Sequence, residues 1–158
     1  MSRKLRRQIE LEFTQLRRLM ERHPHLLEKG PADAPTPVEI DALAALLHSF
    51  YTGIENMFKR IGIAIDGAPP KGELWHAQLL DSMSCSTPVR GPVISKELRT
   101  ALRKFLDFRH VFRHAYSFEL EWDKIAPLVR ECRPTFQRLE EEVARFIERL
   151  DEAGEMPR

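Results

Sequence analysis

Apolar residues recur at steps of three and four along most of this sequence, and clusters of proline separate the stretches in which they do so. Eight of the eleven prolines fall in three clusters, at residues 24–37, 69–70 and 88–92. Apolar residues three and four apart share one face of an α-helix, and proline ends a helix because it lacks a backbone N–H. The sequence therefore predicts an all-α fold, an up-and-down antiparallel helical bundle of about four to five helices.

Five helical segments are expected from this pattern, at about residues 2–22, 37–61, 73–83, 95–116 and 123–150. Thr36 is the expected N-cap of the second segment, because Pro37 takes the first helical position and Glu39 supplies the carboxylate of a capping box. Ser95 and Asp123 are expected to cap the fourth and fifth segments.

Three further features of the sequence concern a kink in the last helix and two connections between helices. Pro134 is expected to kink the last helix, since proline breaks a helical hydrogen bond. Residues 62–65 carry the only trace of strand alternation. Residues 84–93, with glycine, proline and small side chains, are typical of an exposed loop.

The length of 158 residues favours one domain, 1–158, whose core is large enough to be stable without disulfide bonds or structural metal ions. Within it we expect an N-terminal helix and proline-rich loop at 1–35 and the bundle at 36–152. Cys85 and Cys132 are too few for a disulfide framework and are expected to be reduced. No long apolar run predicts a signal sequence or a membrane span, so we expect a cytoplasmic protein.

The formal net charge of +1 hides an uneven distribution of charge. Residues 95–116 carry six lysines and arginines, two acidic residues and two histidines, whereas residues 117–158 are acidic. The fourth helix is therefore locally positive, as a contact with phosphate requires.

The end of that positive helix carries the sequence Arg-His-Val-Phe-Arg-His-Ala-Tyr, residues 109–116. These residue types suit RNA cleavage without a metal. The planar guanidinium of Arg109 can hold the oxygens of a phosphodiester, and the imidazole of His114 can move a proton near neutral pH. His110 and Arg113 are candidates for widening the phosphate contact.

Each of these residues also has a structural interpretation. Arg109 falls in the apolar stripe of its helix, so it either lines a cleft or pairs with a glutamate of the last helix, since a buried charge needs a partner. Tyr116, on the same stripe, either lines the same cleft or packs in the core.

The histidines leave a third alternative open. Asp107, His110 and His114 lie three and four apart, a spacing at which their side chains share one helix face and suit a divalent metal. The other four histidines are expected in surface or cap positions: His23, His25, His48 and His76.

Arg109, four intervening residues, His114, one residue and Tyr116 resemble the motif of the HepT-like toxins, ribonucleases of the HEPN superfamily. His110 matches the polar residue that often follows the arginine. The resemblance extends to the all-helical layout and to the sequence Phe-Tyr-Thr-Gly-Ile-Glu at residues 50–55. It covers roughly residues 36–152.

The resemblance implies an endoribonuclease that needs no metal and no cofactor. Arg109 would bind the scissile phosphate of the RNA substrate and His114 would move the proton of the attacking 2′-hydroxyl, which leaves 2′,3′-cyclic phosphate and 5′-hydroxyl ends. On a straight helix the two side chains point about 140° apart. A bend near His114, or a homodimer whose two motifs face a shared cleft, would resolve that separation.

The resemblance also implies a partner, a minimal nucleotidyltransferase (MNT) antitoxin that adds AMP to Tyr116. A phosphate added near Arg109 would occupy the anion site and repel RNA. The rival hypothesis is a non-catalytic helical module, in which the long last helix forms a dimer or partner interface and residues 109–116 are structural.

Overall fold

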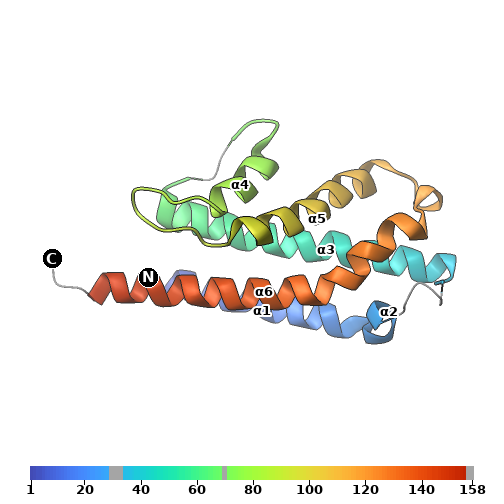
Figure 1. Cartoon of the computed structure of the whole chain (residues 1–158), viewed down its shortest axis with the longest axis horizontal. Helices are drawn as coiled ribbons and strands as arrows, with labels where there is room; N and C mark the ends of the chain where they lie inside the picture. Colours follow the sequence, from blue (N-terminus) through green and yellow to red (C-terminus); the bar gives the residue numbers. More distant parts are fainter. Residues whose placement is uncertain (29–33, 69–70, 156–158) are drawn as a thin grey trace.

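The computed structural model describes residues 1–28, 34–68 and 71–155, which form helices and connections without a strand (Figure 1). The helices are α1 (Arg3–Arg22), α2 (Pro24–Glu28), α3 (Pro37–Ile61), α4 (Trp75–Met83), α5 (Lys96–His114) and α6 (Trp122–Glu155). The prediction of an all-α fold is confirmed.

The four long helices run up and down, and the short α4 lies across one end of the pair that α3 and α5 form (Figure 1). α3 packs against α1, α4, α5 and α6, so it is the central helix of the bundle. In α1 the apolar residues that recur at steps of three and four are buried along the whole helix: Leu5, Ile9, Phe13, Leu16 and Met20. The apolar steps of three and four therefore do mark the faces that meet in the core.

Local capping signals set two of the helix starts. The Thr36 hydroxyl accepts from the backbone N–H of Glu39, and the Glu39 carboxylate accepts from that of Thr36, so the expected capping box is present. Ser95 caps α5 as expected. The prediction for Asp123 is wrong, because α6 begins at Trp122 and Asp123 lies in its first turn.

α6 continues through both of its internal prolines, and its axis bends in the N-terminal half that contains Pro127 and Pro134 (Figure 1). The strand alternation at residues 62–65 is misleading, because Gly62–Asp66 is a π-helical turn that extends α3. Among the described helices, none has a stretch long and apolar enough to cross a membrane.

The connection between α4 and α5 is only partly the exposed loop that the sequence predicts. The side chain of Arg90 is fully buried and donates to both carboxylate oxygens of Asp66 at 2.8 Å. It also donates to the backbone carbonyls of Ser82, Cys85 and Gly91. This arginine fixes the connection to the end of α3, because a buried guanidinium must satisfy its donors inside the protein.

Gly53 allows α1 to lie close against α3. A Cβ atom at this position would lie 2.7 Å from Cδ2 and 3.3 Å from Cγ of Leu16. Both distances are too short for ordinary packing, so a side chain at this crossing point would require the buried Leu16 side chain to move.

We expect Gly53→Val to lower the free energy of unfolding by about 1–3 kcal/mol, because the added methyl groups overpack the contact with Leu16. Ala45→Val is the matched control, since Ala45 is exposed on the same helix and should lose less than about 1 kcal/mol. Urea unfolding of both variants measures the difference. Equal losses would show that the close approach at Gly53 does not limit packing.

Candidate functional site

The positive segment 109–116 is helical only as far as His114. Ala115 has φ −106° and ψ 148°, an extended conformation, and a short 3₁₀ turn at Ser117–Glu119 follows. The prediction that the helix continues to residue 116 is therefore wrong by two residues. Helical periodicity does not apply to Tyr116, and its expected position in the apolar stripe is lost.

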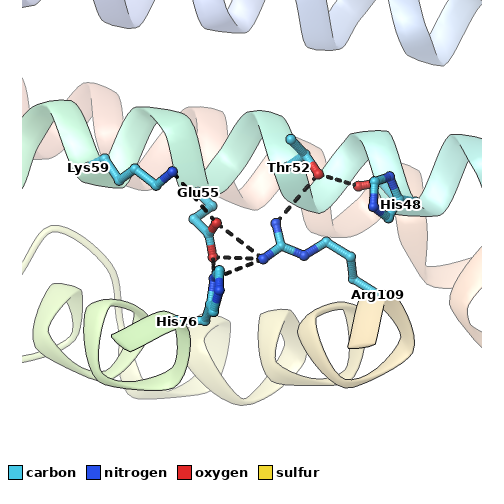
Figure 2. A network of polar contacts seen from close by, with 6 residues as sticks. All are labelled: His48, Thr52, Glu55, Lys59, His76 and Arg109. Atoms are coloured by element: carbon cyan, nitrogen blue, oxygen red, sulfur yellow. Dashed lines mark hydrogen bonds and ion pairs between the residues drawn. The ribbon is translucent and has the colours of Figure 1, made fainter. Parts of the chain in front are cut away.

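Arg109 lies buried between α5 and α3, with 5% of its surface exposed. Its Nη2 donates to both carboxylate oxygens of Glu55 at 3.1 Å, and its Nη1 donates to the Thr52 hydroxyl at 3.4 Å (Figure 2). The guanidinium carbon lies 5.2 Å from the centre of the Tyr51 ring. Arg109 does pair with a glutamate, but the glutamate lies on α3, and the expectation of a partner on the last helix is wrong.

His76 of α4 completes this cluster. Its Nδ1 lies 2.7 Å from Oε2 of Glu55 and 2.9 Å from Nη2 of Arg109 (Figure 2). Nζ of Lys59, one helical turn after Glu55, lies 4.0 Å from the same carboxylate. The prediction of a surface or cap role for His76 is wrong, because sequence spacing gives no sign that residues 55, 76 and 109 meet.

His48 lies on the opposite side of the Arg109 guanidinium from His76 (Figure 2). Its backbone carbonyl accepts a hydrogen bond from the Thr52 hydroxyl at 2.9 Å, and its ring lies 5.2 Å from that of Phe112. Burial lowers the pKa of His48, and the positive charges of Arg109 and Arg113 lower it further. The neutral form of this imidazole is therefore favoured in the positive surroundings at the end of α5.

A cavity of about 450 Å³ opens beside Arg109, between α4 and α5. Three arginines and two histidines line it together with two acidic residues: Arg103, Arg109, Arg113, His76, His110, Glu73 and Asp107. Asp107 accepts a hydrogen bond from Arg103 at 3.0 Å, which offsets one of the positive charges. Glu55 likewise offsets the charge of Arg109, so Arg113 and the two histidines are the groups left to attract an anionic ligand such as a phosphodiester.

His114 and Tyr116 are both exposed, outside the lining of this cavity. The His114 ring packs edge-on against that of His110, with 4.8 Å between ring centres. The Tyr116 side chain is 71% exposed and its ring stacks on Phe118 at 5.4 Å. Placement of Tyr116 in the core is therefore ruled out, and His110 is the residue that connects His114 to the cavity.

The alternative metal site at Asp107, His110 and His114 gains no support from the geometry. In the described part of the chain, no three His, Cys, Asp or Glu side chains are grouped as ligands of one metal ion. The carboxylate of Asp107 instead pairs with Arg103.

The buried ion pair between Arg109 and Glu55 leads to a prediction for the free energy of unfolding. Arg109→Ala leaves the Glu55 carboxylate in the core without its arginine, so we expect it to lower the free energy of unfolding by about 3–5 kcal/mol. His114→Ala removes an exposed side chain and should change that free energy by about 0.5 kcal/mol or less. Urea unfolding tests both variants, and a small loss for Arg109→Ala would contradict the buried ion pair.

Comparison with known proteins places the chain in a family. The sequence model of a family described as HepT-like protein matches residues 42–150, about two thirds of the chain. The matched range contains Glu55, His76, Arg109, His114 and Tyr116. No curated protein and no solved structure matches the chain. The protein belongs to the HepT-like protein family.

Proposed function

We propose that this protein is a metal-independent endoribonuclease, the toxin of a HepT/MNT-type toxin–antitoxin pair. Membership in the HepT-like family supports a HEPN ribonuclease. The observation that carries the proposal is that Arg109, the first residue of the Arg, His and Tyr motif, lines a cavity together with Arg113, His76 and His110. The products of cleavage are RNA ends with a 2′,3′-cyclic phosphate and a 5′-hydroxyl.

Arg109 binds and polarises the scissile phosphate from the wall of the cavity. Its two Nη atoms donate hydrogen bonds to Glu55 and Thr52. In the described part of the chain no residue accepts a hydrogen bond from its Nε, which therefore remains for the phosphate. The ion pair holds the guanidinium in one orientation, so little reorganisation is needed when charge develops on the phosphate. His110 and Arg113, which line the same cavity and are exposed, contact neighbouring phosphate oxygens.

His114 accepts the proton of the attacking ribose 2′-hydroxyl. It lies outside the lining of the cavity that contains Arg109, so a single protomer does not bring the two side chains together on one wall. A homodimer in which the two motifs face a shared cleft would place the exposed His114 of one protomer at the RNA bound by the other. The exposure of His114 supports this arrangement.

Tyr116 is the residue that the MNT antitoxin modifies with AMP. Its side chain is 71% exposed, and it lies beyond the end of α5, where a second protein can reach its hydroxyl without opening the bundle. The added phosphate brings negative charge to the positive end of α5, where it competes with RNA.

The central test of this function is RNA cleavage in the presence of a metal chelator. We expect wild-type protein to produce fragments with cyclic phosphate ends, and His114→Ala to cleave about 10²-fold more slowly or worse, because the base is lost. His25→Ala is the matched control, since His25 is exposed on α2, and it should cleave like wild type. If folded wild-type protein, shown by intact mass to be unmodified, leaves RNA intact, the non-catalytic interaction module becomes the better hypothesis.

Modification is tested with the antitoxin and ATP. We expect wild-type protein to gain the mass of one AMP and to lose cleavage activity, whereas Tyr116→Phe gains no mass and continues to cleave. Tyr51→Phe is the control, because Tyr51 is the only other tyrosine and is 1% exposed. Modification of Tyr116→Phe, or of any residue other than Tyr116, would contradict the assignment of the acceptor.

A further inference from the structure

His76 is a second histidine in the cavity, and a buried carboxylate holds one of its ring nitrogens. Glu55 is 3% exposed, and its Oε2 lies 2.7 Å from Nδ1 of His76. The ring lines the same cavity as Arg109, and 31% of the side chain remains exposed. His76 thus has one side fixed to the core and another available to a ligand.

The contacts of Nδ1 indicate which nitrogen carries the proton. Arg109 only donates hydrogen bonds, and the Glu55 carboxylate only accepts them. If Nδ1 were an acceptor, its lone pair would face the carboxylate oxygen at 2.7 Å, which is unfavourable. A proton on Nδ1 that is donated to Oε2 satisfies Glu55 and leaves Nη2 of Arg109 bonded to both carboxylate oxygens. Nε2 is then the ring nitrogen that is left for a ligand.

Neighbouring side chains restrict the orientation of the His76 ring. The Trp75 ring lies 3.6 Å from the His76 ring, centre to centre, with 31° between the planes. Lys59 places its Nζ 4.7 Å from the centre of the Trp75 ring. The imidazole is therefore held by a hydrogen bond at its edge and by an aromatic ring on its face, as a proton-transfer group requires.

RNA transesterification needs two proton transfers. The 2′-oxygen loses a proton as it forms its bond to phosphorus, and the 5′-oxygen gains one as its bond to phosphorus breaks. His114 serves only the first transfer in the proposed function. Nδ1 of His76 lies 2.9 Å from Nη2 of Arg109, and both side chains line the same cavity, so a phosphate bound in that cavity can contact both.

We propose that His76 is the general acid of this site and that Glu55 is its positioning residue. Nε2 of the imidazolium donates its proton to the departing 5′-oxygen, and the carboxylate of Glu55 stabilises the charged ring until the proton leaves. This inference rests on the proposed ribonuclease function. The other ionisable groups that line the cavity are Glu73, Arg103, Asp107, His110 and Arg113.

The test compares two dinucleotide substrates, one with the natural 5′-oxygen leaving group and one with sulfur in its place. A thiolate leaves without a proton, so loss of a general acid slows only the oxygen substrate. We expect His76→Gln to raise the ratio of the sulfur rate to the oxygen rate by about 10² to 10⁴-fold. This ratio does not depend on how much of the variant is folded, because unfolding reduces both rates equally.

Two further measurements separate the roles. In His76→Gln the alkaline limb of the pH–rate profile should flatten, because no acid remains to be deprotonated, whereas the base variant His114→Ala should lose the acidic limb. His25→Ala is the matched control and should keep the wild-type ratio.

Each outcome decides between the hypotheses. An unchanged ratio in His76→Gln, with wild-type protein active on both substrates, overturns the assignment of His76 and leaves the ribonuclease function standing. If wild-type protein cleaves neither substrate, the proposed function is wrong and the assignment of His76 falls with it.

Discussion

The ion pair between Arg109 and Glu55 is the interaction on which the rest of this structure depends. It joins α5 to the central helix α3, and the same carboxylate holds His76 of α4. Each buried charge is tolerated because the other neutralises it, and Oε2 of the same carboxylate also holds α4 through His76. The groups that we propose to act in the cavity are therefore also groups that hold three helices together.

The fold was predictable because its signals are local. The buried residues of α1 are those that spacing alone selects, and the caps at Thr36 and Ser95 act within one helical turn. Errors arise where other features override a local pattern. Residues 62–65 alternate like a strand, but they continue a 25-residue helix into a π turn. Arg90 lies in a segment with the composition of an exposed loop, yet its partner Asp66 is 24 residues away.

The candidate site was predictable only in part, for a related reason. The motif gives Arg109, His114 and Tyr116 as candidates, and the apolar stripe indicates that Arg109 needs an anionic partner. Helical periodicity gives the face on which a residue lies, but it does not say which residue of another helix it meets. Glu55 and His76 lie 54 and 33 residues from Arg109, and only the packing of α3, α4 and α5 brings them together.

The site therefore has two parts that differ in rigidity. In the rigid part, each side chain contacts at least two neighbours: Arg109, Glu55 and His76. Moving any of them would leave a buried charge without its partner. His114 is the last residue of α5, and Tyr116 lies beyond it, where few contacts must be broken to move the chain. Binding of an anion benefits from the rigid part, because it is already organised. The proposed modification of Tyr116 suits the exposed part, because a group attached there would add charge beyond the end of α5 without unpacking the core.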